Sequence, residues 1–201
     1  KICGITRAED RDAAIAAGTD ALGFVFYPPS PRYVMPEKAA QLVSSIPAFV
    51  SRVGLFVNAE PATVHAVLAE VALNVLQFHG DEDAAYCRQF GMPWIKAARV
   101  RPGLDLLEYA RAFEGACGLL LDAFVDGYGG GGKEFDWSLI LSSLPLPVIL
   151  SGGLNVANIQ QAVRVIRPWA VDVSSGVEMA KGIKDAEKIA QFIAGVRNAD
   201  A

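Results

Sequence analysis

Charged side chains are scarce in this sequence, at 20% of its 201 residues against an average of about 25%. The formal net charge is −4 at pH 7, so Lys and Arg are not in excess. A mildly acidic chain has no general electrostatic attraction for nucleic acid or for an anionic membrane surface. We therefore expect neither partner, and an anionic ligand has to be held by a local site.

Cysteine and histidine are also few. The three cysteines, Cys3, Cys87 and Cys117, are too few and too odd in number for a disulfide framework, and they show no metal-ligand spacing. The two histidines, His65 and His79, lie far apart and form no HExxH motif. We expect no metal site, and we expect the reducing cytoplasm as the compartment.

Long apolar runs are absent as well. No run approaches the ~20 residues of a membrane-spanning helix, and the N-terminus turns polar within a few residues, unlike a signal peptide. The numbering starts at Lys1 and not at Met, so we expect a short leader before it. Hydrophobic residues as a class reach 52%, enough for the core of a single domain spanning 1–201.

Short apolar runs alternate with amphipathic stretches along the whole chain. The runs are rich in Val, Ile, Leu and Phe, which is typical of strands buried on both faces of a parallel sheet. The predicted strands are Lys1–Cys3, Ala21–Phe26, Val53–Val57, Val75–His79, Trp94–Ala98, Gly118–Leu121, Val148–Leu150 and Ala170–Val173. The predicted helices are Ala8–Ala17, Pro36–Ile46, Glu60–Ala72, Glu82–Phe90, Leu104–Phe113, Trp137–Leu141, Asn155–Ile166 and Asp185–Val196. Thr6 and Gly18 are the expected caps of the first helix.

Eight regular strand–helix units decide the predicted fold. The starts of successive strands are spaced roughly as one βα unit requires. An open doubly wound sheet is the alternative, but it usually has fewer strands and binds its ligand at one switch point. We predict an α/β fold, a single (β/α)8 TIM barrel, with its active site at the C-terminal ends of the strands.

Polar residues inside or just after predicted strands are the candidates for that site. They are Cys3, Arg32, Gln77, His79, Asp122 and Asp172. An aspartate that follows three leucines, as Asp122 does, is costly to bury unless it is paired or has a task. Structural interpretations also exist: Cys3 as a buried apolar thiol, His79 as a hydrogen-bonded core residue, and Asp122 as a loop cap.

Two Gly/Ser clusters follow the last two predicted strands. The first contains Gly152 and Gly153, and the second contains Ser174, Ser175 and Gly176. Glycine lets N–H groups approach an anion, and the helix N-terminus expected near Asn155 adds a favourable dipole. The loops after strands 7 and 8 often hold phosphate in this fold. The clusters predict a phosphate site built mainly from backbone, with ordinary βα turns as the alternative.

The glycine run at 127–132 formally fits GxGxxG, and Lys133 extends it toward a P-loop. However, Glu134 stands where a P-loop has Ser or Thr, no helix starts at the last glycine, and the acidic residue expected about 20 positions further on is absent. We interpret Gly129–Gly132 as a flexible active-site loop instead of a nucleotide site.

Several motifs, in order from residue 1 to about 195, resemble those of one enzyme family. They are Lys1–Thr6, Phe26–Val34, Val53–Asn58, Leu76–Gly80, Leu120–Asp122, the Gly-rich run with Lys133, Phe135–Trp137, Ser151–Leu154 and Asp172–Glu178. The sequence resembles the phosphoribosylanthranilate isomerases of tryptophan biosynthesis. Two departures are small: the strand before Cys3 is clipped, and the glycine run lacks the Ser or Thr that the family often has.

The resemblance implies an Amadori rearrangement of N-(5-phosphoribosyl)anthranilate to the 1-deoxyribulose 5-phosphate aminoketose, without cofactor or metal. By position, Asp122 would be the general acid that opens the furanose ring, and Cys3 the general base that removes the C2 proton. Because the base must be a thiolate, a local positive field is expected to lower the pKa of Cys3.

The resemblance also implies the binding residues and the partners. Arg32 would bind the anthranilate carboxylate, and His79 and Asp172 would line the pocket. Phosphate would lie against Gly152, Gly153, Ser174, Ser175 and Gly176. The expected partner is a small phosphorylated substrate, with the chain as a monomer or homodimer.

Two alternatives remain for the function. The isomerase of histidine biosynthesis performs the same chemistry, but that family resembles a two-fold repeat with Asp at the ends of its first and fifth strands. Here the first strand offers Cys3, and the fifth, Trp94–Ala98, has no Asp. A non-catalytic sugar-phosphate-binding barrel could dispense with Cys3 or Asp122, yet both are present.

Overall fold

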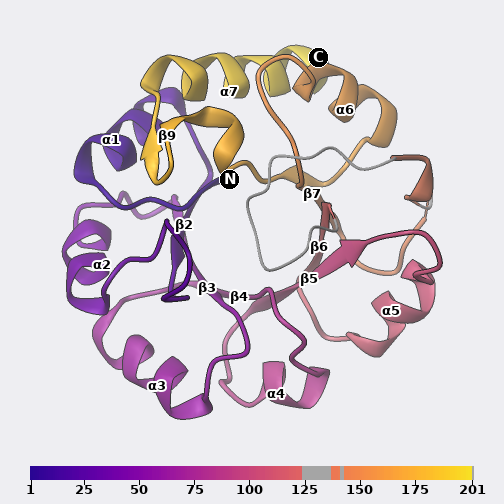
Figure 1. Ribbon diagram of the computed structural model, residues 1–201, viewed down its shortest axis with the longest axis horizontal. Coiled ribbons are helices and arrows are strands. Elements are labelled where there is room, and N and C mark those ends of the chain that lie inside the picture. Colours follow the sequence, from indigo (N-terminus) through magenta and orange to yellow (C-terminus); the bar gives the residue numbers. More distant parts are fainter. Residues whose placement is uncertain (124–136, 141–142, 201) are drawn as a thin grey trace.

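Eight parallel strands follow one another around a ring in sequence order (Figure 1). They are β1 (Ile2–Cys3), β2 (Ala21–Val25), β3 (Ser51–Phe56), β4 (Val75–Phe78), β5 (Trp94–Val100), β6 (Gly118–Ala123), β7 (Val148–Leu150) and β8 (Ala170–Val171). The computed structural model describes residues 1–123, 137–140 and 143–200. Gly129–Gly132 and Lys133, with the active-site loop predicted there, lie outside the described residues.

The ring closes between the first and last strands. Ile2 and Val173 form a parallel bridge, in which the N–H of Cys3 donates to Val173 O at 2.8 Å and the N–H of Val173 donates to Lys1 O at 3.1 Å. Closure removes both sheet edges, as a barrel requires. The predicted (β/α)8 barrel is confirmed, and the doubly wound alternative is wrong.

Helices surround the strands on the outside (Figure 1). They are α1 (Ala8–Ala17), α2 (Pro36–Val43), α3 (Pro61–Glu70), α4 (Ala84–Arg88), α5 (Leu106–Ala112), α6 (Ile159–Ile166) and α7 (Ala186–Asp200), with 3-10 turns η1 (Trp137–Leu139) and η2 (Ser175–Val177). Within the described ranges, none of these helices has the length and apolarity to cross a membrane.

The first helix has the predicted bounds and only one of the predicted caps. Gly18 ends α1 in the left-handed conformation at φ 86°, where glycine carries no steric cost. Arg7, not Thr6, is the N-cap residue, and its side chain makes no capping bond. The hydroxyl of Thr6 donates instead to Gly182 O at 2.7 Å, so a long-range contact outcompetes the local cap.

A short antiparallel ribbon after β8 was not predicted. It consists of β9 (Glu178–Ala180) and β10 (Ile183–Lys184), joined through Gly182 at φ 78°. The hairpin lies beside α1 in Figure 1. It returns the chain toward the β1 end of the barrel before α7 begins, and it thereby brings two charged side chains to the site.

Side-chain alternation along β6 separates the barrel interior from the helix layer. Leu119 and Leu121 pack with residues of α5, whereas Leu120 packs with Ile95 and Ile149 of neighbouring strands. Asp122 therefore shares the inner face with Leu120. Inside the barrel, Leu120 belongs to an apolar cluster with Ile95, Ala97 and Ile149.

Candidate active site

Strand β1 places Lys1 and Cys3 on the same inward face, two residues apart. Gly23 of β2 pairs with Cys3, and its lack of a side chain makes room for both. A methyl group at Gly23 would lie 2.7 Å from Cys3 Sγ and 3.1 Å from Lys1 Cε. Lys1 and the thiol therefore lie together in a space that only glycine leaves open.

The ammonium group of Lys1 connects two other strands to this pair. It donates to Asp172 Oδ2 at 2.7 Å and to Gln77 Oε1 at 2.9 Å, with the Lys1 and Asp172 side chains only 8% and 6% exposed. Burial acts to lower the pKa of Lys1, but the Asp172 carboxylate and the Cys3 thiol outweigh it and raise that pKa. Lys1 is thus a buried cation held between Gln77 and Asp172.

The thiol of Cys3 is buried, and burial raises its pKa above the ordinary value. Lys1 and Lys184 act to lower that pKa, and Asp172 acts to raise it. The expected positive field is present, but the expected direction is wrong for the protein without substrate. Desolvation of the thiolate exceeds the attraction of two lysines that are themselves paired with carboxylates.

His79 connects the Lys1 side of the mouth to Asp122. Its Nδ1 lies 3.0 Å from Gln77 Nε2, and its Nε2 lies 3.0 Å from Asp122 Oδ2. Because an ammonium group only donates, Gln77 Oε1 must accept from Lys1, and the amide nitrogen then faces the ring and donates to Nδ1. His79 is therefore protonated at Nε2 and donates to Asp122.

The loops after β3 and β4 hold His79 in place. Glu82 accepts from the N–H of Gly80 at 2.9 Å and from the N–H of Asn58 at 2.7 Å. Lys96 of β5 donates to Glu82 at 2.8 Å and to Gly80 O at 2.7 Å, and both side chains are almost fully buried. A charge pair outside the barrel thereby fixes the backbone next to His79.

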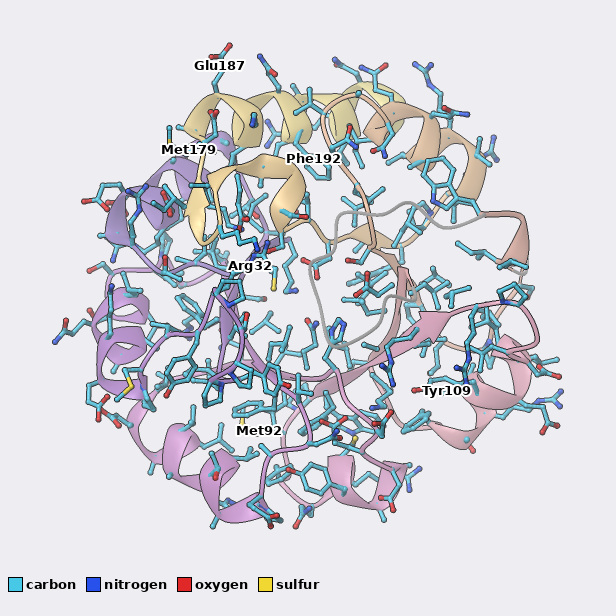
Figure 2. All side chains as sticks on the ribbon, in the orientation of Figure 1. Arg32, Met92, Tyr109, Met179, Glu187 and Phe192 are labelled. Carbon is cyan, nitrogen blue, oxygen red and sulfur yellow. The ribbon has the colours of Figure 1, made fainter. Side chains whose placement is uncertain are left out.

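Arg32 is buried and already carries a carboxylate partner. Its Nε and Nη2 donate to the two oxygens of Glu178 at 2.7 and 2.9 Å, a bidentate pair of the stronger kind. The side chain passes over Gly4, where a methyl group would lie 2.6 Å from Arg32 Cδ. Figure 2 shows Arg32 inside the ring of helices, close to the central opening of the barrel.

Glu178 is also paired with Lys184, at 2.9 Å. Burial acts to raise the pKa of Glu178, but the hydrogen bond from Arg32 and the charge of Lys184 bring it below the ordinary value. Burial lowers the pKa of Lys184, and Glu178 offsets part of that effect. Lys184 also donates to Ser174 O and Oγ at 3.1 and 3.3 Å. The β9–β10 ribbon thus adds a cation beside the second Gly/Ser cluster.

The structure brings the two Gly/Ser clusters together. A methyl group at Gly176 would overlap Leu154 O and lie 2.9 Å from Asn155 Cα, so the loop after β8 packs directly on the loop after β7. Gly152 and Gly153 both have left-handed φ angles, 76° and 72°. Their conformation needs glycine, and substitution there costs strain.

Helix α6 starts at Ile159 and not at Asn155, so the predicted boundary is wrong. Asn155 Oδ1 accepts from the N–H of Ala157 at 2.8 Å, and Asn158 Oδ1 accepts from the N–H of Asn155 at 2.8 Å. Asn side chains compete for backbone donors in this way and replace the first helical turn. Both Asn amides also donate to Gly153 O, at 3.1 and 3.0 Å, which holds the glycine loop.

Asp172 has one oxygen on Lys1 and one without a protein donor among the described residues. Its Oδ1 is buried, and no described group donates to it. Leaving a buried acceptor unsatisfied costs about 1–3 kcal/mol. A donor from a bound molecule would remove that cost.

Four residues of this site were not predicted: Lys1, Gly23, Glu178 and Lys184. Lys1 begins the motif Lys1–Thr6, and Glu178 ends the motif Asp172–Glu178. The sequence alone does not show which charged residue pairs with either of them. Lys184 stands in a stretch that the hydrophobic pattern left unassigned. Gly23 resembles any small residue of a buried strand, and only the neighbouring thiol shows why it is glycine.

The comparisons with known proteins give a consistent result. A family model described as N-(5'phosphoribosyl)anthranilate (PRA) isomerase matches residues 1–195. The chain belongs to this isomerase family. The N-(5'-phosphoribosyl)anthranilate isomerase of Dechloromonas aromatica is 65% identical over 200 residues, covering 100% of this chain and 96% of the relative.

Solved structures agree with the family. Phosphoribosyl anthranilate isomerase from Thermotoga maritima has a TM-score of 0.90 at 44% identity, covering 98% of this chain and 97% of that one. A phosphoribosyl anthranilate isomerase in complex with reduced 1-(o-carboxyphenylamino)-1-deoxyribulose 5-phosphate has a TM-score of 0.87 at 42% identity, with the same coverage. The predicted family, barrel fold and function, an isomerase of tryptophan biosynthesis, are confirmed.

Proposed function

We propose that the chain rearranges N-(5'-phosphoribosyl)anthranilate to 1-(2-carboxyphenylamino)-1-deoxyribulose 5-phosphate with Asp122 as general acid and Cys3 as general base. The observation that carries the assignment is their placement. Cys3 is the last residue of β1 and Asp122 the last but one of β6, and hydrogen bonds through Gln77 and His79 connect Lys1, beside Cys3, to Asp122. Two proton transfers at two different substrate atoms require such a separation.

The steps follow from these positions. The proton of Asp122 goes to the furanose ring oxygen as the C1–O bond breaks, which leaves an iminium between C1 and nitrogen. The Cys3 thiolate takes the C2 proton, and the electrons of that C–H bond form C1=C2 and neutralise the nitrogen. The enolamine then gains a proton at C1 and loses its O2 proton to give the ketone. Asp172 Oδ1, which lacks a described donor, is placed to accept from a substrate hydroxyl.

Binding of the two anionic ends completes the proposal. Glu178 uses the Nε edge of Arg32, which leaves donors on the Nη1 edge of the guanidinium for the anthranilate carboxylate. The phosphate lies against Gly152, Gly153, Ser174, Ser175 and Gly176, and His79 and Asp172 line the pocket between. The structural relative with the reduced aminoketose phosphate supports a phosphorylated small molecule as the partner.

The proposal also covers the compartment, the domain organisation and the oligomeric state of the enzyme. A cytoplasmic location suits a mechanism that needs Cys3 as a free thiol, and Cys3 and Cys87 are both free in the structure. Residues 1–201 act as one catalytic domain, which functions as a monomer or a homodimer.

Turnover of the proposed substrate tests the function. Purified enzyme should convert N-(5'-phosphoribosyl)anthranilate to a product with a ketone carbon in its 13C NMR spectrum, at the same rate with and without a chelator. The aminoaldose substrate of histidine biosynthesis should be left unchanged. Absence of ketone product, or dependence on added metal, would contradict the proposal.

Replacing Arg32 should weaken substrate binding. Loss of a charge-assisted contact with the anthranilate carboxylate costs roughly 1.5–3 kcal/mol, so Arg32→Ala should raise KM by about 10- to 150-fold. Steady-state kinetics with phosphoribosylanthranilate and with the phosphoribosylaniline analogue, which lacks the carboxylate, measure the effect. The wild-type enzyme should discriminate between the two, and Arg32→Ala should not; equal discrimination by both enzymes would remove Arg32 from the carboxylate site.

Inorganic phosphate should be a weak competitive inhibitor that occupies the Gly/Ser clusters. Gly153→Asp should abolish this inhibition because it places a carboxylate beside the anion. Gly153→Asn is the matched control, since it carries the same left-handed backbone strain at φ 72° without the charge. The inhibition constant for phosphate in each variant is the measurement. Equal sensitivity of the Asp and Asn variants would show that phosphate binds elsewhere.

A further inference from the structure

We propose that Lys1 is the positioning residue that organises both halves of the site, by supplying the counter-charge for the Cys3 thiolate that forms during catalysis and by fixing the direction of the hydrogen bonds that run through Gln77 and His79 to Asp122. The proposal rests on the proposed roles of Cys3 and Asp122. It goes beyond them because Lys1 neither gives nor takes a proton in that mechanism.

The base half depends on one buried cation beside the thiol. Cys3 Sγ and Lys1 Cε both contact the space over Gly23, and each side chain is a hydrogen-bond partner of the other. The charged groups acting on Cys3 are Lys1, which precedes β1, Asp172, which follows β8, and Lys184 of β10. Lys184 is hydrogen-bonded to Glu178 and Ser174, whereas Lys1 is hydrogen-bonded to the thiol itself. Lys1 is therefore the main counter-charge for a Cys3 thiolate.

Lys1 is also paired with Asp172, and the negative charge of that carboxylate disfavours a negative charge on the Cys3 sulfur. In the protein without substrate, the balance favours the neutral thiol. A substrate hydroxyl that donates to Asp172 Oδ1, the oxygen without a described donor, would weaken the hold of Asp172 on Lys1. The ammonium would then serve the thiolate more fully, so the base would be activated when the sugar is bound.

The general-acid half of the site depends on which atom donates in each hydrogen bond between Lys1 and Asp122. An ammonium group cannot accept a hydrogen bond, so Lys1 holds Oε1 of the Gln77 amide toward itself and Nε2 toward His79. His79 must accept at Nδ1 and therefore donates from Nε2 to Asp122 Oδ2. A reversed amide would protonate Nδ1 and leave Nε2 as an acceptor for the proton of Asp122. The inferred direction prevents His79 from taking that proton, so the proton stays on Asp122.

Two readouts that do not need turnover separate this proposal from the proposed function. The first is the pH dependence of Cys3 alkylation by iodoacetamide, followed by peptide mass spectrometry with exposed Cys117 as the internal reference. Because Lys1 lowers the pKa of Cys3, Lys1→Met should move the Cys3 midpoint upward by about one pH unit or more, which is about a tenfold loss of thiolate. Lys1→Arg should move it less, and Lys38→Met, an exposed lysine, should not move it.

The second readout is the tautomer of His79, measured by 15N NMR in an Asp122→Asn background. An Asn side chain at position 122 can donate to His79 Nε2 or accept from it. In this background, only the hydrogen bond between Gln77 and His79 Nδ1 selects the tautomer of His79. His79 should be protonated at Nε2, and adding Lys1→Met or Gln77→Met should give a mixture of tautomers. The other histidine, His65, packs against Phe90 away from the site and serves as the reference signal.

The variants test the two parts of the proposal, the Cys3 counter-charge and the His79 tautomer, separately. Gln77→Met keeps Lys1 beside the thiol, so the Cys3 alkylation midpoint should stay near that of the wild type while the His79 tautomer changes. If Lys1→Met does not fold, Lys1→Gln removes the same charge for the alkylation readout, and Gln77→Met still gives the tautomer readout. The proposal is overturned if removing the charge leaves the alkylation midpoint unchanged, if Lys1→Arg shifts it as far as Met does, or if His79 stays an Nε2–H tautomer without Gln77.

Discussion

Cys3→Ala should lower kcat by about 10²- to 10⁴-fold, the range expected when a general base is removed. KM should change little, because the carboxylate, phosphate and hydroxyl contacts assigned to Arg32, the Gly/Ser clusters and Asp172 remain. Single-turnover and steady-state kinetics on phosphoribosylanthranilate measure both constants. The enzyme should also lose activity on alkylation of this thiol.

The matched control is a second buried cysteine. Cys87 of α4 lies in the core, and burial raises the pKa of its thiol to about 12, so it is neutral at working pH. Cys87→Ala removes the same atom and should leave kcat within a few-fold of the wild type at a temperature where the variant is folded. If Cys3→Ala retains near-normal turnover, another group is the base.

Asp122→Asn should lower kcat by a similar factor of about 10²- to 10⁴-fold. The Asn carbonyl oxygen can still accept from His79 Nε2, so the local hydrogen bond at 3.0 Å has a replacement and the fold should be kept. Only the transferable proton is lost, and ring opening has no other assigned acid. The kinetics should show a fall in kcat with a small change in KM.

Asp12→Asn is the control for a change of carboxylate to amide. Asp12 is 62% exposed and pairs with Arg11 on α1, in the outer layer of helices. It should leave turnover unchanged. An Asp122→Asn enzyme as active as Asp12→Asn would exclude Asp122 as the general acid.

The barrel was predictable because its strands are buried on both faces. Such strands read as separate apolar runs, and one of them, Val148–Leu150, has the predicted bounds. The ends of elements were less predictable, because polar side chains compete for the same backbone groups. Thr6 bonds to Gly182, and Asn155 and Asn158 replace the first turn of α6.

The inward placement of the site residues was also predictable, because alternation along a strand assigns each side chain to one face. The partners of these residues were not. Arg32 finds Glu178 across 146 positions, and Lys1 finds Asp172 across 171. Sequence spacing carries no information about such contacts, which depend on barrel closure and on the unpredicted β9–β10 ribbon.

A crystal structure of this enzyme with reduced 1-(o-carboxyphenylamino)-1-deoxyribulose 5-phosphate tests the central claim most directly, since one complex locates every assigned group. The account predicts the phosphate against Gly152, Gly153 and Gly176, the carboxylate on the Nη1 edge of Arg32, and Cys3 Sγ within contact distance of sugar carbon C2. Asp122 should face the oxygen that leaves the ring. A ligand bound in the opposite direction, or with C2 out of reach of Cys3, would contradict the account.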